Sequence, residues 1–295
     1  MVNGKVVILL CLIASLVLMG CTKHDSGSSS MEAPQSSGSS TASSLSSSSD
    51  ASSRPSSSSS DFGGYYSSIS DSLTNGLNGT LRTSLTSLIQ PSAYYSYSGS
   101  GSGDLGYELE NFDEDPKNAS NMYMFYLNVS IPKETSSAGT WNREHVWPQS
   151  LSDDLYGKSG GGADALHIRP TVEATNSRRG NLKYGEAASG SPATLDFRGT
   201  TYTYAHTTSS YFEPSDEVKG DCARIVFYMY VCYFANRGTP IANCCESIAR
   251  MVEWSELDPV SELEAHRNDC AQRSRQRNRN PFVDHPEWVR RIFEA

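Results

Sequence analysis

At positions 141–148 the chain reads Trp-Asn-Arg-Glu-His-Val-Trp-Pro, which sets Glu144 beside His145 between two tryptophans. A glutamate oxygen is a hard ligand that suits Mg²⁺ or Ca²⁺. A histidine near its intrinsic pKa can take a proton from water at neutral pH. The pair therefore indicates a metal-and-base site, although a hydrogen-bonded surface histidine explains His145 as well. No second histidine follows four residues later, which excludes the zinc-protease signature.

A second polar motif occupies residues 164–181 and reads Asp-Ala-Leu-His-Ile-Arg-Pro-Thr-Val-Glu-Ala-Thr-Asn-Ser-Arg-Arg-Gly-Asn. Pro170 and Thr171 suit a helix start and predict that Asn176 lies about two turns into that helix. An asparagine oxygen is a neutral hard ligand, and beside one carboxylate it leaves most Mg²⁺ positions to water and phosphate. Taken alone, an asparagine in a helix is more often a surface or capping residue.

Together the two motifs closely resemble the bacterial endonuclease I family, extracellular or periplasmic nucleases of the His-Me finger (ββα-metal) class. The resemblance continues through residues 212–221, 253–260 and 278–288 and spans nearly all of residues 64–295. It implies an α+β fold, with a ββα-metal catalytic core embedded in a largely helical single domain. It also implies a metal-dependent endonuclease that hydrolyses DNA, RNA or both to 5′-phosphate products.

The same resemblance assigns the catalytic roles. His145 matches the general base that activates water, and Glu144 and Asn176 match the two protein ligands of one divalent metal. Mg²⁺ is the expected ion, with Mn²⁺ or Ca²⁺ as alternatives. In this scheme the metal stabilises the charge that develops on the phosphoryl oxygens and the leaving 3′-oxygen.

Further polar residues near the two motifs are candidates for contact with the substrate phosphate, where a guanidinium fork suits the anion. His167 stands where other family members carry asparagine, and a role in orienting the site and a role in packing are equally open. At least one arginine of the second motif is expected to be an ordinary surface or salt-bridge residue. The candidates are Arg143, His167, Arg169, Arg178 and Arg179.

The charge of the chain bears on its partners. The formal net charge is −9, with a net of −6 in residues 1–139 and −3 in residues 140–295. Basic residues cluster in the second part, around Arg178 and between Arg267 and Arg279. The second of these runs is expected to form either a groove that tracks the nucleic-acid backbone or a solvated helix face. We expect nucleic acid to be held through its backbone, with little sequence specificity and a steep fall of affinity with salt. No protein partner is implied.

The first 63 residues predict export and tethering. Residues 1–20 read as a signal peptide, since Lys5 precedes an apolar run that is short for a membrane span. The run ends in Leu-Met-Gly-Cys at 18–21, which resembles a lipobox and implies lipidation of Cys21. Residues 21–63 are rich in serine and are predicted to be a disordered linker. The resulting expectation is an exported protein that is lipid-anchored to the cell envelope, with the nuclease domain at 64–295; an uncleaved anchor is the alternative.

Five cysteines follow the predicted lipidation site, and an odd number leaves at least one thiol unpaired. Cys244 and Cys245 are adjacent and are not expected to bond to each other, because that ring is strained. Cys222 and Cys232 lie in an apolar stretch and are expected to be buried. The pairing of the five remains open.

Hydrophobic periodicity and turn residues predict the remaining elements. We expect an amphipathic helix over 65–90, a buried strand over 122–129, a glycine-rich loop over 157–162 and a strand over 200–206. Further helices are expected over 221–236, 248–257, 260–277 (with Ser261 as a possible cap) and 286–293.

Two other functions fit parts of the sequence. A zinc-dependent hydrolase could use His145, His167 and His206, although their spacing matches no compact zinc site. A non-enzymatic surface lipoprotein explains the lipobox and the serine-rich linker equally well, but it leaves Glu144, His145 and Asn176 without a role.

Overall fold

The computed structural model describes residues 62–99, 101–133, 139–152 and 157–294. The predicted signal peptide, Cys21 and all but the last two residues of the predicted linker lie outside the described residues. Among the described helices, none is long and apolar enough to cross a membrane.

The described residues combine eight α-helices with three small sheets, which confirms the α+β class. The sheets are β1-β2-β3, β4-β5 and β6-β9-β8-β7, and every pair is antiparallel except β6 with β9. The strands are β1 Glu114–Asp115, β2 Asn118–Met124, β3 Val129–Pro132, β4 Trp141–His145, β5 Ile168–Val172, β6 Lys183–Tyr184, β7 Ser191–Phe197, β8 Thr200–Thr207 and β9 Tyr211–Pro214. The helices are α1 Thr80–Leu88, α2 Leu105–Phe112, α3 Glu173–Arg179, α4 Asp216–Met229, α5 Ile248–Leu257, α6 Glu262–Arg273, α7 Pro281–Asp284 and α8 Trp288–Phe293.

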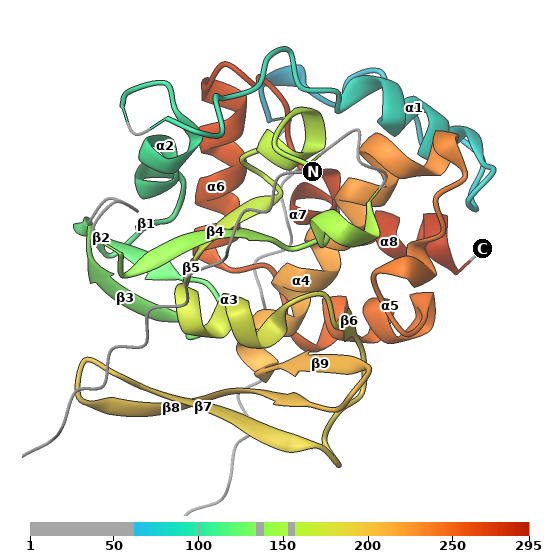
Figure 1. The fold of residues 1–295 in the computed structure, drawn as a ribbon. Coiled ribbons are helices and arrows are strands. Elements are labelled where there is room, and N and C mark those ends of the chain that lie inside the picture. Colours follow the sequence, from blue (N-terminus) through green and yellow to red (C-terminus); the bar gives the residue numbers. More distant parts are fainter. Residues whose placement is uncertain (1–61, 100, 134–138, 153–156, 295) are drawn as a thin grey trace, which may run out of the picture. The chain divides into compact units, whose positions relative to one another are not determined.

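The two sequence motifs meet in the β4–β5 pair and the helix that follows it. Glu144 is the register partner of Arg169, and His145 is the partner of Ile168. Helix α3 starts directly after β5 and lies between this pair and the β7–β8–β9 sheet (Figure 1). β4 pairs with β5 along one edge, and within the described residues no strand pairs with its other edge.

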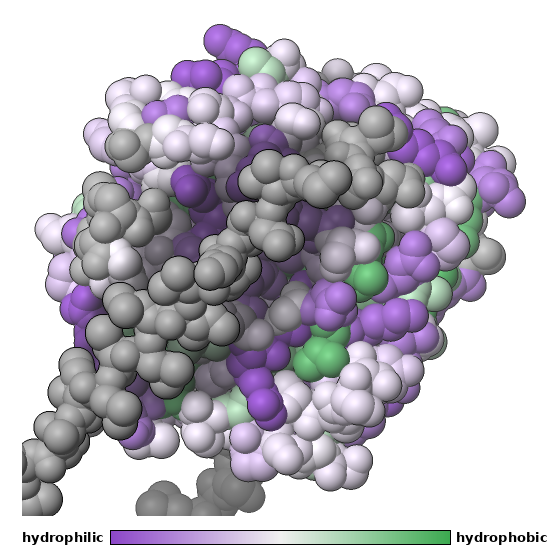
Figure 2. Space-filling model, viewed as in Figure 1, coloured by the Kyte–Doolittle hydropathy of each residue, from purple (hydrophilic) through white to green (hydrophobic). Residues whose placement is uncertain are grey.

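Helix α4 supplies much of the core, since every residue from Val218 to Met229 is buried. It continues into a π-helical turn at Tyr230–Phe234 and ends near Gly238, whose φ of +74° suits glycine. Hydrophilic residues prevail on the face drawn in Figure 2, and hydrophobic residues form only small patches there. Among the described large hydrophobic residues, Tyr107 and Leu257 are exposed.

Several predicted elements are confirmed. The strand over 200–206 is β8, the helix over 248–257 is α5, and the terminal helix is α8. Ser261 caps α6 as predicted, because its hydroxyl accepts from the Glu264 N–H while the Glu264 carboxylate accepts from the Ser261 N–H. The predicted helix over 221–236 begins five residues earlier, at Asp216, because its first turn is polar and carries no apolar signal.

The predicted helix over 65–90 is wrong for residues 65–79. Only Thr80–Leu88 is helical. Gly76 has a φ of +92°, and Thr74 and Thr80 exchange hydrogen bonds across the turn. A Cβ on Gly79 would lie 2.2 Å from the Asn75 carbonyl oxygen, so this turn depends on glycine. Local side-chain bonds of threonine and serine here replace helical ones.

Two further boundaries differ from prediction. β2 ends at Met124, and a turn reaches Asn128, whose φ of +48° reverses the chain into β3. Pro170 and Thr171 do not start a helix but belong to β5, where the Pro170 carbonyl accepts from the Phe125 N–H at 2.9 Å. Asn176 is therefore the fourth residue of α3 rather than two turns in. The predicted helix over 260–277 ends at Arg273.

Candidate active site

Side chains of β4 alternate between two sides, as the pleat of a strand requires. Asn142 and Glu144 face α3, where they contact Asn176 and Arg179. Arg143 and His145 face away from α3. The candidate metal ligands thus share the α3 side of the strand, and the candidate base lies on the other side.

Glu144 is held firmly within the protein. The Tyr126 hydroxyl donates to its Oε1 at 2.6 Å, and the Arg179 Nε lies 3.6 Å from the same oxygen. Tyr184 completes the group through a 2.7 Å bond to Tyr126. Burial raises the pKa of Glu144 above its usual value, and Arg179 and the Tyr126 bond offset only part of that shift. The carboxylate is therefore oriented by its neighbours and has a nearby cation that favours its charged form.

Asn176 is oriented through its amide nitrogen. Its Nδ2 donates to the Asn142 Oδ1 at 2.6 Å and approaches the Arg143 carbonyl oxygen at 3.4 Å. Because the nitrogen is engaged, Oδ1 is the atom left for a ligand. A carboxylate and an amide oxygen on one side of β4 are the hard donors that Mg²⁺ prefers. These two residues therefore fit the implied ion.

His145 is 8% exposed and is fixed through its Nε2. This nitrogen lies 3.0 Å from the Gly157 carbonyl oxygen and 3.1 Å from that of Gly162. Two carbonyls favour the tautomer that carries its proton on Nε2, which makes Nδ1 the proton acceptor. The Gln149 Nε2 also lies 3.0 Å from this nitrogen; that contact alone would favour the opposite tautomer, but the two carbonyls outweigh it. Burial and the neighbouring His167 lower the pKa of His145 to about 3, so the ring is neutral.

His167 supports the segment that fixes His145, which we call the glycine segment (residues 157–163). Its Nδ1 lies 2.8 Å from the Gly161 carbonyl oxygen, and its Nε2 accepts from the Trp147 N–H at 3.0 Å. A Cβ on Gly161 would meet Met229 and Tyr233 at 3.1–3.3 Å, so the close packing depends on glycine. Both ring nitrogens of His167 thus bind backbone, and the two histidine rings lie 5.5 Å apart.

Arg143 is held beside the candidate base by an aromatic ring. Its guanidinium carbon lies 4.6 Å from the centre of the Tyr97 ring, which is itself 5.4 Å from the His145 ring. The Nη1 of Arg143 is buried and has no hydrogen-bond partner. Lys158 adds a second cation 5.7 Å from the same ring. A buried donor without an acceptor is costly, and an incoming anion would satisfy it.

The three arginines of the second motif are placed differently. Arg169 is 1% exposed, and its Nε donates to Asp113 at 2.9 Å. Arg179 is fully buried and donates to the Val146 carbonyl at 2.7 Å. Arg178 is exposed and donates to the Thr207 hydroxyl at 2.6 Å. Of the three, Arg178 is the one that solvent and a polyanion can reach.

The second basic run is split in the same way. Arg267 and Arg279 are buried in ion pairs with Asp113 and Asp284. Arg273, Arg275 and Arg277 are exposed. The run is therefore neither a continuous groove nor a fully solvated face.

Several residues of the site carry no signal in the sequence. Tyr97 comes from a tyrosine- and serine-rich stretch more than 40 residues before His145, and Asn142, Tyr126 and Gln149 resemble ordinary polar residues. For the zinc alternative, His206 lies on β8 and pairs in register with Glu213. Within the described residues, no three His, Cys, Asp or Glu side chains are grouped to hold a metal.

The five cysteines of the described residues are all free. Cys222 and Cys232 are buried, as predicted, and the adjacent Cys244 and Cys245 are not bonded to each other. Cys270 is partly exposed and lies 3.3 Å from the His266 Nε2.

Comparison of the sequence with known proteins identifies the family of the chain. The family model for endonuclease I matches residues 78–287. An extracellular ribonuclease of Bacillus subtilis (strain 168) is 35% identical over 231 residues, which are 72% of this chain and 74% of that protein. An extracellular ribonuclease of Bacillus amyloliquefaciens is 35% identical over 244 residues, which are 78% of each chain. The chain therefore belongs to the endonuclease I family and is a nuclease that hydrolyses phosphodiester bonds of nucleic acids.

Proposed function

We propose that the protein is a metal-dependent endonuclease with little sequence specificity, and that the β4–β5–α3 unit is its ββα-metal core. The observation that carries this proposal is the fixed orientation of His145. Two backbone carbonyls hold its Nε2, and the other side of the same strand carries Glu144 and Asn142, which holds Asn176 of α3. Strand β4 and helix α3 thus offer an oriented base and two oriented oxygen ligands.

His145 acts as the general base in this proposal. Its Nδ1 accepts a proton from water, while Nε2 keeps its own proton and donates it to the Gly157 and Gly162 carbonyls, which stabilise the resulting imidazolium. The pKa of about 3 ensures a neutral ring before substrate binds. A phosphate close to the ring raises that pKa, because a negative charge favours the protonated form. His145 is thus available as a base at neutral pH and gains basicity when substrate arrives.

Glu144 and Asn176 would hold one divalent ion, with Mg²⁺ expected and Mn²⁺ or Ca²⁺ as alternatives. The bound ion supplies charge stabilisation for the phosphoryl oxygens and the leaving 3′-oxygen. Tyr126 and Arg179 orient Glu144, and Asn142 orients Asn176. Arg143 donates its spare Nη1 to a phosphate oxygen on the base side, held there by Tyr97.

The unpaired edge of β4 offers a path for the substrate. In this proposal a phosphate at this edge is approached by the base from one side of the strand and by the metal ligands from the other. Arg178, which solvent reaches, is placed on α3 to contact a neighbouring phosphate. Contacts with the backbone carry no sequence information, which explains the low specificity proposed.

RNA and DNA are both proposed substrates, and RNA is supported by the names of the two Bacillus relatives. The test is digestion of RNA, single-stranded DNA and plasmid by the purified full-length protein, with Mg²⁺ and with EDTA. We expect cleavage to 5′-phosphate ends that EDTA abolishes. A folded preparation that cuts none of the three substrates with any divalent ion refutes the proposal.

Export and lipid anchoring through Cys21 form a separate part of the proposal. They are supported by the Leu-Met-Gly-Cys motif at 18–21 and by the extracellular relatives. Labelling of expressing bacteria with a palmitate analogue should mark the protein, and a Cys21→Ala variant should lose the label. An unlabelled wild-type protein refutes the anchor and leaves the nuclease assignment intact.

A further inference from the structure

A buried carboxylate that takes no part in the proposed mechanism follows the glycine segment in the chain. Asp164 is fully buried, and its Oδ2 accepts from the hydroxyls of Tyr228 and Tyr233, the second at 2.6 Å. Its Oδ1 accepts from the Leu166 N–H and from the Gln276 Nε2, both at 2.8 Å. All four donors are neutral, and together they hold the side chain from both of its oxygens.

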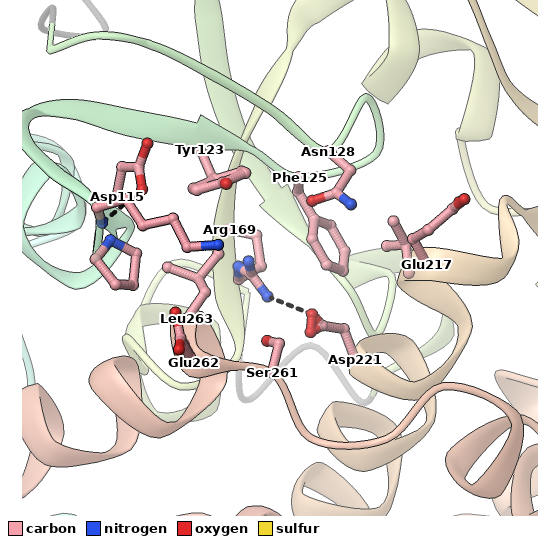
Figure 3. A pocket seen from close by; sticks show the side chains of 13 residues that line it. Asp115, Tyr123, Phe125, Asn128, Arg169, Glu217, Asp221, Ser261, Glu262 and Leu263 are labelled. Atoms are coloured by element: carbon pink, nitrogen blue, oxygen red, sulfur yellow. Dashed lines mark hydrogen bonds and ion pairs between the residues drawn. The ribbon is translucent and has the colours of Figure 1, made fainter. Parts of the chain in front are cut away.

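A second buried aspartate shows that burial alone does not produce this arrangement. Figure 3 shows Asp221 facing Arg169 in a separate cavity of about 280 Å³. The Arg169 Nη1 lies 3.7 Å from the Asp221 Oδ2, which is too long for a hydrogen bond. Within the described residues, the Asp221 Oδ1 has no hydrogen-bond partner. The four bonds of Asp164 are therefore not a general consequence of placing an aspartate in this core.

The two tyrosines converge on Asp164 because α4 ends in the π-helical turn at Tyr230–Phe234. In an α-helix each residue advances by about 100°, so side chains five residues apart diverge by about 140°. A π-helical turn bonds each residue to the fifth one along and brings such side chains back together, and turns of this kind are frequent at functional sites. Tyr228 stands just before the turn and Tyr233 within it, and their rings lie 6.3 Å apart. The turn thus aims both hydroxyls at one carboxylate.

Tyr233 and Asp164 both contact the glycine segment next to the carbonyl that holds the candidate base. A Cβ on Gly161 would lie 3.2 Å from an atom of the Tyr233 ring. The Asp164 N–H donates to the Gly161 carbonyl at 3.3 Å. The next residue, Gly162, presents the carbonyl oxygen that lies 3.1 Å from the His145 Nε2. A shift of Asp164 or Tyr233 therefore moves this carbonyl.

Packing alone does not fix His145. A small cavity of about 10 Å³ borders this residue, and His167, Met229 and Phe234 line it as well. That space is roughly what one water molecule requires. The orientation of the imidazole therefore depends on the carbonyls of the glycine segment and on whatever holds them in place.

We propose that Asp164 and Tyr233 are positioning residues for the base. They fix the Gly162 carbonyl, which accepts the Nε2 proton of His145 and so keeps Nδ1 as the proton acceptor. The inference rests on the proposed role of His145. It implies that loosening the glycine segment lowers kcat, because the base leaves its alignment. KM and metal affinity stay unchanged, because Arg143 and the metal ligands do not depend on this carbonyl.

Tyr233→Phe is the variant least liable to disturb the fold, because it removes the bond to Asp164 and keeps the ring that packs on Gly161. We expect kcat on RNA with Mg²⁺ to fall by about 3- to 10-fold, the worth of one hydrogen bond. Asp164→Ala should lower kcat by about 100-fold, the cost of misplacing a catalytic group by a small distance. KM and Mn²⁺ affinity should match wild type in both. An unchanged kcat in Tyr233→Phe, or a fall of Mn²⁺ affinity together with kcat, overturns the proposal.

Two further variants separate positioning from general stability. Asp164→Asn should recover most of the activity lost in Asp164→Ala, because an amide offers an acceptor and a donor in the same places and a tyrosine hydroxyl can accept as well as donate. Asp284→Ala is the matched control, since it removes a buried carboxylate that accepts from Arg279 and Tyr66. It should lower the free energy of unfolding and leave kcat as in wild type. An equal loss of kcat in Asp284→Ala counts against the proposal.

The deciding measurement requires no cleavage. NMR spectra of the full-length protein with ¹⁵N-labelled histidine show which ring nitrogen carries the proton, and His145→Ala assigns the signal among the six histidines. In EDTA we expect the Nε2 tautomer of His145 in wild type and Asp284→Ala, and a mixture of tautomers in Asp164→Ala and Tyr233→Phe. The wild-type tautomer in both of the latter variants overturns the proposal, whether or not RNA is cut. The expected tautomer change in a protein that cuts no RNA refutes the nuclease function alone.

Discussion

Asn142 and Glu144 face α3 from one side of β4, whereas Arg143 and His145 face Tyr97 and the glycine segment from the other. On the α3 side, the candidate ligands Glu144 and Asn176 are held by other side chains, through short hydrogen bonds and the buried Arg179. On the other side, backbone carbonyls and an aromatic ring hold the imidazole and the guanidinium. Both sides fix their functional groups, but by different means.

In the proposed mechanism this difference corresponds to a division of roles. Carboxylate and amide oxygens suit an ion, and Arg179 and Asn142 contact the two proposed ligands. The proposed base must be neutral and free to accept a proton, and His145 is held through its other ring nitrogen. Variants on the base side should change turnover and leave metal affinity unchanged, and variants on the α3 side should change metal affinity first.

His145→Ala should have the largest effect. Loss of the general base lowers kcat by about 10²–10⁴-fold, because proton transfer from water loses its acceptor. The affinity for Mn²⁺, measured from the electron paramagnetic resonance of the free ion, should stay as in wild type. Full activity in this variant would remove His145 from the role of base, and a large loss of Mn²⁺ affinity would break the division between the two sides.

Glu144→Gln tests the α3 side with a side chain of the same shape. The amide oxygen can still accept from Tyr126, but the negative charge is lost beside Arg179. We expect Mn²⁺ affinity to fall by at least about 100-fold, since even changes to outer residues of metal sites cost about 10–100-fold. Isothermal titration of Mn²⁺ into the substrate-free protein measures this. Unchanged affinity would mean that the ion binds elsewhere.

The candidate residues of this site can be chosen from the sequence, but the residues that support them cannot. Glu144, His145 and Asn176 stand out because the motifs around them are long, and their roles remain predictions. Tyr126 and Tyr97 do not stand out, because they reach the site only through tertiary packing. Arg169 illustrates the limit, since its partner Asp113 is more than 50 residues away and a local charge count cannot show that the pair is buried. Pro170 misled the helix prediction, because proline suits the start of a helix but is also accepted within an edge strand such as β5.

Arg143→Lys should sharpen the description of the base side. Lysine keeps the positive charge but loses the fork that stacks on Tyr97 and offers the spare Nη1. We expect kcat/KM on RNA to fall by about 10- to 100-fold, the cost of losing one charge-assisted hydrogen bond. Arg273→Lys, on the exposed face of α6, is the matched control and should behave as wild type. Mn²⁺ affinity that fell together with kcat/KM would place Arg143 with the metal ligands.

Asn142→Ala should have a smaller effect on the α3 side. The Asn176 amide loses the acceptor that turns its oxygen toward the ion, but the Arg143 carbonyl remains 3.4 Å away. We expect Mn²⁺ affinity to fall by about 10-fold, with kcat recovered at saturating metal. Asn142→Asp keeps an acceptor and should restore most of the affinity. A loss of kcat that excess metal does not rescue would contradict a purely orienting role.

His167→Asn should give the smallest effect, and it concerns stability rather than turnover. Burial lowers the pKa of His167 to about 4 in the folded protein, against an ordinary value of 6.5. Between these two pH values the unfolded chain binds a proton at this residue that the folded chain does not. The contribution of His167 to the free energy of unfolding is therefore complete above pH 6.5 and is lost as the pH falls toward 4. One such histidine contributes at most about 1.4 kcal/mol per pH unit. Urea unfolding at pH 7.5, 6 and 5 measures this free energy. It should fall less steeply with decreasing pH in the variant than in wild type. His145, whose pKa is also lowered, contributes a loss of the same sign in both proteins. Equal slopes would mean that the pKa of His167 is the same in the folded and the unfolded chain, which would contradict the burial and the bond to the Trp147 N–H described above.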